Sequence, residues 1–139
     1  MKIDKLFAGL VRIANGDYVL RGDLVVDGDL EIDLDDRFVV EGEIKVSGGI
    51  SAGRGISAGD GISAGRGISA GLGISAGRSI SAGWGISAGW SISAGDGISA
   101  GFRIFAGISV FSSSTSCMKT IKCKELLHGE ICYGDLIIK

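Results

Sequence analysis

One hydrophobic pattern, with a period of six residues, runs through most of the chain. Isoleucine recurs at every sixth position of the central tract, and alanine usually follows it two residues later. The isoleucines are Ile50, Ile56, Ile62, Ile68, Ile74, Ile80, Ile86, Ile92, Ile98 and Ile104. The same spacing continues towards the N-terminus through Ile44 and Phe38. Beyond a two-residue insertion near "DLDDR" it resumes at Leu30, Leu24 and Tyr18, so the glycine-rich tract and the more varied segment before it belong to one architecture.

The repeated unit, Ile-Ser-Ala-Gly-x-Gly, fits a short strand followed by a corner. Isoleucine and alanine point to one side of the strand and serine to the other, because side chains alternate along an extended backbone. Gly-x-Gly supplies the backbone freedom for a turn. Three strand residues and three corner residues, repeated, are typical of one side of a β-solenoid coil. An α-helix is excluded, because a six-residue repeat does not keep isoleucine on one helical face.

The variable corner residues distinguish between two and three hexads in each coil. With two hexads, the arginines of successive repeats would stack directly, which neighbouring like charges disfavour. With three hexads, Arg78 lies between Asp60 and Asp96, and Arg66 lies against Trp84 in reach of a cation–π contact. We therefore expect an all-β fold, a parallel β-helix or solenoid whose triangular coils each contain three hexapeptides. Its handedness stays open.

The two ends of the chain depart from the repeat and are expected to cap it, because stacked coils leave open strand edges. Residues 1–16 form the predicted N-terminal cap. Their apolar residues follow helical spacing and predict a short helix, whereas "LVRIANGDYVL" could equally begin the first strand. The helical positions are Ile3, Leu6, Phe7, Leu10 and Val11.

The remaining boundaries follow from the repeat. The predicted solenoid spans 17–111, with acidic coils at 17–43 and Ile-Ser-Ala-Gly-x-Gly coils at 44–111. Residues 112–139 are expected to form a surface loop, rich in serine and threonine, and then short strands that close the C-terminal edge.

Composition narrows the class of protein. Glycine accounts for 25 of 139 residues and proline is absent, but 45% of residues are hydrophobic, which is unlike a disordered chain. No apolar run approaches the ~18 residues of a membrane-spanning helix, so we expect no membrane contact. The cysteines Cys117, Cys123 and Cys132 occur without an export signal, which indicates a reduced compartment such as the cytoplasm of a bacterial host.

Negative charge is concentrated near the N-terminal end of the repeat. Residues 17–43 contain ten acidic and two basic residues, a local charge of −8 in a chain of net charge −2, so the remainder carries +6. We expect one acidic strip that either keeps the strand edge soluble or meets a basic protein partner, such as one that normally holds nucleic acid. Direct binding of nucleic acid is not expected. The candidate residues, called here the acidic segment, are Asp23, Asp27, Asp29, Glu31, Asp33, Asp35, Asp36, Glu41 and Glu43.

Four apolar side chains occupy the variable corner position of the repeat. They are Leu72, Trp84, Trp90 and Phe102. A corner points outward, so these residues form a candidate surface for a protein partner or for self-association, unless loops or a cap cover them. A homo-oligomer therefore stays open.

The chemistry of the chain offers little for catalysis. The hexad resembles that of the hexapeptide-repeat acyltransferases, left-handed β-helices whose active site usually uses a histidine base, but here serine rather than glycine follows the aliphatic residue. The one histidine, His128, lies in the predicted C-terminal cap, away from the coils. Together with the three cysteines it has the ligand types of a zinc site without the usual paired spacing. We expect no catalytic residue, metal or cofactor.

A second resemblance concerns the whole repeat. Residues 23–139, with "GGISAGRGISAG" and the tail "IKCKELLHGEICYGDLII", resemble uncharacterised glycine-rich repeat proteins of bacteriophages and mobile elements. The resemblance implies a small protein that binds and blocks host machinery, as CRISPR or restriction inhibitors do. Three hypotheses follow: a non-catalytic binding protein of this inhibitory kind, a structural or self-assembling solenoid, and an acyltransferase-like enzyme.

Overall fold

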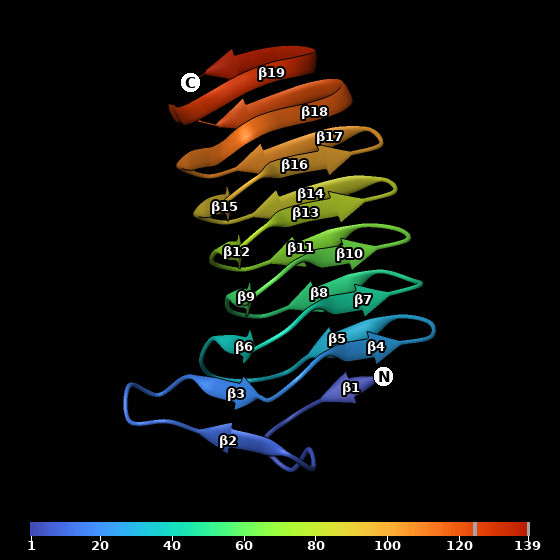
Figure 1. Ribbon diagram of the computed structural model, residues 1–139, viewed down its shortest axis with the longest axis vertical. Helices are drawn as coiled ribbons and strands as arrows, with labels where there is room; N and C mark the ends of the chain where they lie inside the picture. The colour runs from blue at the N-terminus through green and yellow to red at the C-terminus, as the bar shows by residue number, and fades with distance from the viewer. Residues whose placement is uncertain (124, 139) are drawn as a thin grey trace.

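The protein folds as a parallel β-solenoid in which short strands stack in successive coils (Figure 1). The computed structural model describes the backbone of residues 1–123 and 125–138 and the side chains of residues 1–112 and 115. All regular structure in the described backbone is β-strand, nineteen strands joined in one hydrogen-bonded sheet. The predicted all-β solenoid is therefore confirmed.

The strands form three parallel stacks, which are the faces of a triangular prism. Face A consists of β4 (Leu24–Val26), β7 (Ile44–Val46), β10 (Ile62–Ala64), β13 (Ser79–Ala82) and β16 (Gly97–Ala100). Face B consists of β5 (Leu30–Ile32), β8 (Ile50–Ala52), β11 (Ile68–Ala70), β14 (Gly85–Ala88) and β17 (Arg103–Ala106). Face C consists of β3 (Tyr18–Leu20), β6 (Phe38–Val40), β9 (Ile56–Ala58), β12 (Ile74–Ala76) and β15 (Ser91–Ala94).

The register between coils confirms three hexads per coil. Ile62 pairs with Ile44 below it and with Ile80 above it, so one coil takes 18 residues. In the first coil Leu30 pairs with Ile50, a spacing of 20, because the two-residue insertion lies in that coil. The corners are named by the faces they join: corner AB, corner BC and corner CA.

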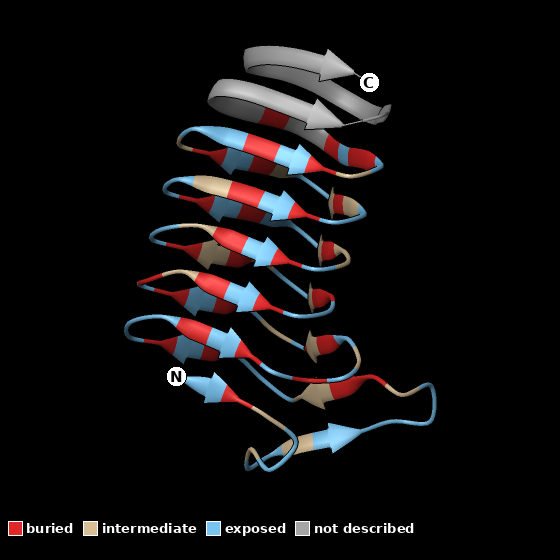
Figure 2. Cartoon of the chain, turned by 180° about the vertical axis from the view of Figure 1, so that it is seen from behind, coloured by how far each residue is buried: buried red, intermediate tan, exposed pale blue. Residues whose placement is uncertain are grey.

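The interior is built from columns of isoleucine and alanine. From β7 to β17 each hexad buries its first aliphatic residue and the residue two positions later, whereas the residue between them, serine in all but the two end strands, points outward (Figure 2). Burying an isoleucine side chain stabilises a fold by about 1.5–3 kcal/mol, so the eleven such residues from Ile44 to Ile104 supply a large part of the stability of the coil stack.

The glycine that follows alanine in the hexad is needed for a reason other than the turn flexibility that the sequence predicts. Positive φ angles in the described chain occur only at Gly9, Gly16, Gly22 and Gly28, all near the N-terminus. From Gly59 to Gly107, a Cβ atom on this glycine would overlap the backbone carbonyl of the coil below; Gly77, for example, would strike the oxygen of Gly59. The corner glycines are therefore needed for close approach of the coils rather than for an unusual turn conformation.

The predicted N-terminal helix is wrong, and the strand alternative holds. β1 (Lys2–Ile3) pairs in parallel with β5, and β2 (Leu10–Arg12) pairs in antiparallel with β3. Glu31 N–H donates to the carbonyl of Met1 at 2.8 Å, and Asp33 N–H donates to that of Ile3 at 2.8 Å. The open edge of the first coil offers these backbone hydrogen bonds to an extended segment, which a helix could not use. Ile3 is buried, whereas Leu6 is 93% exposed.

The predicted surface loop after Phe111 is also wrong. β18 (Ser109–Cys123) pairs in turn with β15, β16 and β17, so it forms another complete coil. β19 (Glu125–Ile138) runs parallel to β18 and covers it, which confirms the predicted C-terminal strand cap. Thr115 takes the place above Ile98 in the interior column and shares a 2.7 Å hydrogen bond with the Ser112 hydroxyl.

Candidate protein-binding surfaces

The variable corner residues stack in three columns, as the three-hexad coil predicts. At corner AB, Trp84 N–H donates to the carbonyl of Arg66 at 3.0 Å and Phe102 N–H to that of Trp84 at 2.6 Å. At corner BC, Trp90 N–H donates to the carbonyl of Leu72 at 3.0 Å. The backbone ladder therefore holds the corner side chains of each column in register, one above the other.

The apolar corner side chains are exposed rather than covered. Trp84 is 64% exposed, Trp90 59% and Phe102 47%, whereas Leu72 is half-buried. Two further exposed residues were not among the candidates: Ile108, which extends the corner BC column above Trp90, and Phe105, which stands in the serine position of β17. Their signal in the sequence is a large apolar residue at a position where the repeat has serine or a variable residue.

These residues lie along both borders of face B. Trp84 and Phe102 stand at corner AB; Leu72, Trp90 and Ile108 stand at corner BC; Phe105 lies on the face between them. Six apolar side chains thus gather around the upper part of one face, and they are called here the apolar rails. A flat solenoid face bordered by exposed tryptophans is a favourable geometry for a protein interface.

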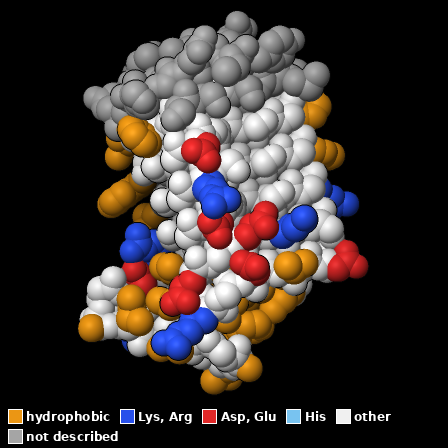
Figure 3. Space-filling model, in the orientation of Figure 1, with side chains coloured by type: hydrophobic (Ala, Val, Ile, Leu, Met, Phe, Trp, Pro, Cys, Tyr) orange, Lys and Arg blue, Asp and Glu red, His pale blue; other side chains and the backbone are white. Residues whose placement is uncertain are grey.

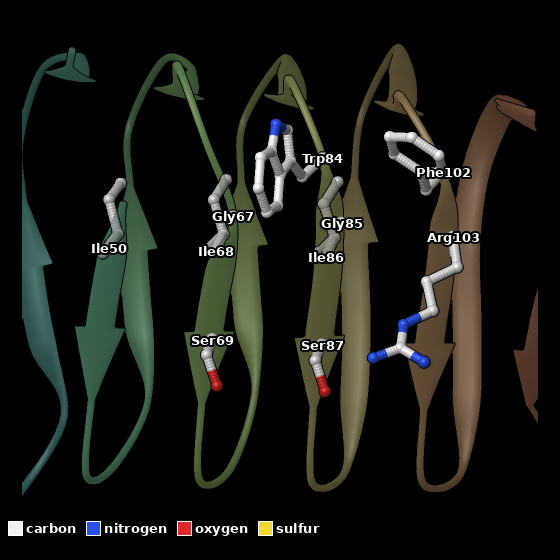
Figure 4. Close-up of a pocket in the computed structure, with 10 residues that line it drawn as sticks. All are labelled: Ile50, Gly67, Ile68, Ser69, Trp84, Gly85, Ile86, Ser87, Phe102 and Arg103. Atoms are coloured by element: carbon white, nitrogen blue, oxygen red, sulfur yellow. The ribbon is translucent and has the colours of Figure 1, made fainter. Parts of the chain in front are cut away.

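A surface groove of about 800 Å³ runs beside the corner AB rail (Figure 4). Trp84 and Phe102 form its apolar wall, and Ser69 and Ser87 lie on the outer side of β11 and β14 at its floor. Arg103 extends across the face next to Ser87, so the groove combines aromatic surface, hydroxyl groups and one cation.

In the upper repeats corner CA carries only charged variable residues, whereas each of the other two corners carries apolar side chains above one arginine. Arg78 Nε lies 3.5 Å from Asp60 Oδ1, and Asp96 N–H donates to the carbonyl of Arg78 at 2.8 Å. The predicted Asp–Arg–Asp column is therefore present. In Figure 3 charged side chains lie along the middle and lower part of the view, and hydrophobic ones lie along both upper edges and at the lower end. The expected cation–π contact of Arg66 with Trp84 is not formed; among described side chains that contact is between Arg12 and Tyr18, at 5.4 Å.

The acidic segment does not form one strip. Its residues surround the N-terminal coils at all three corners: Asp23, Glu41 and Glu43 at corner CA, Asp27 and Asp29 at corner AB, Asp33, Asp35 and Asp36 at corner BC, and Glu31 on face B. The predicted coil of three hexads already assigns successive acidic corners to different sides of the prism, so one strip did not follow from the repeat.

Several of these carboxylates bond to the neighbouring coil. Asp23 Oδ1 accepts the Glu43 N–H at 2.8 Å, and Asp29 Oδ1 accepts the Gly49 N–H at 2.7 Å. Asp27 Oδ1 accepts the Ser47 hydroxyl at 2.8 Å. At the junction of the first two coils, carboxylates therefore satisfy groups of the next corner, a structural role for these three residues.

The insertion fastens the N-terminal segment to the first coil. Asp33 pairs with Lys2 at 2.7 Å, and Asp35 pairs with Lys5 at 2.8 Å while accepting the Tyr18 hydroxyl at 2.7 Å. The hydrogen bonds from Lys5 and Tyr18 lower the pKa of Asp35 to about 2, and the bond to Asp35 raises the pKa of Tyr18. These contacts give Asp33 and Asp35 a structural role in holding the N-terminal segment against the first coil.

The prediction that the C-terminal histidine and cysteines neither catalyse a reaction nor bind a metal concerns side chains that the structure does not describe. His128, Cys117, Cys123 and Cys132 belong to this group. Among the side chains that are described, no group of three histidine, cysteine, aspartate or glutamate residues could hold a metal ion.

Within the described chain no helix is long and apolar enough to cross a membrane. Comparisons with protein-family models, with curated proteins and with solved structures find no match for this chain.

Proposed function

We propose that the chain is a non-catalytic binding protein whose protein partner docks on the apolar rails. The observation that carries the proposal is the exposure of Trp84 and Trp90, at 64% and 59%, on the two borders of one flat face. Tryptophan is enriched among the residues that dominate binding energy at protein interfaces. Neither side chain contributes much to the interior, so the fold itself does not require an aromatic residue at either position.

The apolar rails suit this role better than the acidic segment does. Asp33 and Asp35 are paired with Lys2 and Lys5, and Asp23 and Asp29 bond to backbone groups. A partner that binds these carboxylates must break contacts that the fold already uses. The ion pairs that it could form in their place are exposed, and such pairs contribute only about 0–1 kcal/mol each. Burial of a large aromatic side chain at an interface contributes more.

The resemblance to glycine-rich repeat proteins of phages and mobile elements supports a finer form of the proposal. In this form the protein acts in the cytoplasm of a bacterial host and inhibits a nucleic-acid-handling defence complex by occupying its surface. A rigid solenoid with a flat, partly apolar face suits such a blocking role, because little conformational entropy is lost when it binds.

Site-specific photocrosslinking in bacterial cells tests the proposal. A photoreactive phenylalanine analogue replaces Trp84 in one variant and Ser81, exposed on face A, in the control. We expect one discrete crosslinked protein from position 84 and none from position 81, and loss of that product when Trp90→Ala is added. Crosslinks to a second copy of the chain would instead support the self-assembling solenoid, and equal products from both positions would contradict docking on the rails.

A further inference from the structure

The charges around the apolar rails are all positive, although the chain as a whole is negative. Above the acidic segment, the charged side chains among the described residues of face B and its two corners are Arg54, Arg66 and Arg103. Arg66 lies directly below Trp84 in the corner AB column, and Arg54 lies below Leu72 in the corner BC column. The acidic residues of the upper repeats, Asp60 and Asp96, stand at corner CA, across the prism from face B.

The groove beside corner AB repeats this combination at short range. Arg103 is its one charged lining residue, and its side chain lies over the same face as the Trp84 and Phe102 wall. A guanidinium group can bind a carboxylate through two parallel hydrogen bonds, while the aromatic wall accommodates an apolar side chain. The groove therefore has the features that recognise an acidic residue next to an apolar one.

We propose that the rails and face B select an acidic protein partner, one whose docking surface presents carboxylates among apolar side chains. This inference rests on the proposed function and specifies the chemistry of the partner. It also differs from the expectation of a basic partner, because the surface with exposed aromatic residues carries arginines and the carboxylates are in the N-terminal coils.

The dimensions of face B favour a different protein over a second copy of this chain. Face B contains five strands spaced about 4.8 Å apart, and a strand together with its two corners is about 20 Å wide. A flat contact across face B would therefore cover roughly 500 Å² on each molecule. That area is below the roughly 800 Å² per partner of a stable interface. A second flat face could not reach around the corners, whereas a concave partner surface could cover both rails and add the outer sides of Trp84 and Trp90.

Nucleic acid would find the same surface less favourable. Proteins that neutralise many phosphates commonly make about 6–10 phosphate contacts, and three arginines spread over face B and its two corners supply fewer. Exposed tryptophan together with arginine is instead the composition of a protein–protein interface centre.

The local charge can be measured without a partner, because the two tryptophans of the chain both stand on the rails. At constant ionic strength, iodide and caesium ions report the potential around tryptophan through fluorescence quenching. We expect iodide to quench more efficiently than caesium, relative to N-acetyltryptophanamide. In the Arg66→Glu/Arg103→Glu variant the ratio of iodide to caesium quenching should fall by roughly twofold or more. Charges close to the indole ring change the local concentration of each ion by this much even in water. The control, Arg21→Glu/Lys45→Glu, changes net charge equally but alters corner CA and face A, and should keep the advantage.

Binding is then tested with defined acidic polypeptides, read from selectively excited tryptophan fluorescence. Poly(Glu,Tyr) should bind the wild type more tightly than poly(Glu) or poly(Lys,Tyr), and Arg66→Glu/Arg103→Glu should weaken its binding by roughly tenfold, as two attractive contacts become repulsive. Arg66→Gln/Arg103→Gln serves as a milder variant if the first does not fold. Equal affinity of the arginine and control variants, preference for poly(Lys,Tyr), or tighter binding of oligo(dT) would each overturn the inference.

The two proposals fail in different ways. Suppose that position 84 crosslinks a protein and that Trp90→Ala abolishes this product. If the same protein binds the Arg66→Glu/Arg103→Glu variant with unchanged affinity, the proposed binding function is supported and the proposal of an acidic partner is contradicted. If poly(Glu,Tyr) binds as expected but no protein crosslinks in cells, the surface chemistry is right and the proposed function is not.

Discussion

Gly77 lies against the backbone carbonyl of Gly59 in the coil below, so closely that a methyl group on Gly77 would overlap its oxygen. The same relationship joins Gly83 to Gly65 and Gly89 to Gly71. The other glycine of the hexad has no such constraint: a Cβ on Gly73 would lie 3.5 Å from the Ser91 oxygen, an ordinary contact. Gly77 is therefore required by the stacking distance, whereas Gly73 is replaceable.

A matched pair of substitutions tests this difference. Gly77→Ala should destabilise the protein by about 1–3 kcal/mol, the usual cost of forcing extra atoms into a packed site. Gly73→Ala should be neutral or stabilise by about 0.4–1 kcal/mol, because it restricts the unfolded chain without a clash. Chemical denaturation of both variants measures the effect, and equal stabilities would show that the coils can separate to accept a side chain.

The alternation of buried and exposed positions makes a second prediction. Ile80→Asp places a carboxylate in the interior column and should abolish cooperative folding, because an unpaired buried charge costs several kcal/mol. Ser81→Asp, one residue further along the same strand but exposed, should change stability by less than about 0.5 kcal/mol. Circular dichroism and thermal unfolding compare the two, and a cooperative transition in Ile80→Asp would contradict the inward assignment.

The contacts of Asp35 predict acid sensitivity of the N-terminal segment. Its pKa in the folded protein is about 2, below the ordinary 3.8, so its ionised form stabilises the fold. That stabilisation is complete above about pH 4 and is lost as the pH falls through about 2. We expect the thermal midpoint to fall across this window.

Asp35→Asn removes the ionisable group and should flatten this part of the pH profile while lowering stability at pH 7. Asp96→Asn, exposed at corner CA, is the matched control and should keep the wild-type profile. If the profiles of wild type and Asp35→Asn run in parallel between pH 4 and 2, the contacts with Lys5 and Tyr18 do not stabilise the fold.

The rails predict that binding and stability respond to different residues. Trp84→Ala and Trp90→Ala remove exposed side chains and should shift the free energy of unfolding by less than about 1 kcal/mol. If the proposed interface is correct, each should raise the dissociation rate from the partner strongly, with little change in the association rate. A loss of stability comparable to that of a core variant would mean that the rails serve the fold instead.

The sequence was most informative where side-chain direction follows the repeat. The spacing of Ile44, Ile62 and Ile80 predicts the three-hexad coil, and the charges of Asp60 and Arg78 predict which corner residues stack. Both predictions depend only on the six-residue period of the sequence, because each hexad stacks on a hexad of the same pattern. Exposure of Trp84, Trp90 and Phe102 also follows, since the variable residue of a Gly-x-Gly corner has no interior to enter.

The ends could not be read in the same way, because there the partner strand decides the structure. The apolar spacing of residues 3–11 suits a helix, but the open edges of β5 and β3 form backbone hydrogen bonds with the segment and draw it into the sheet. The serine-rich stretch after Phe111 has the composition of a loop, but β15, β16 and β17 offer it a complete template. Thr115 can occupy an isoleucine column because Ser112 is placed to share its hydroxyl hydrogen bond.

The 18-residue coil also makes the length of the molecule adjustable in discrete steps. Inserting or deleting three hexads between β7 and β17 would lengthen or shorten the prism by about 4.8 Å and leave its two ends facing the same way. One or two hexads would instead rotate the C-terminal coils by about a third of a turn relative to the acidic ones and move Trp84 and Trp90 to different corners. Repeat number in related sequences should therefore change in threes wherever the geometry between the ends matters, and a chain that differs by a single hexad should present its tryptophans to a partner on another side.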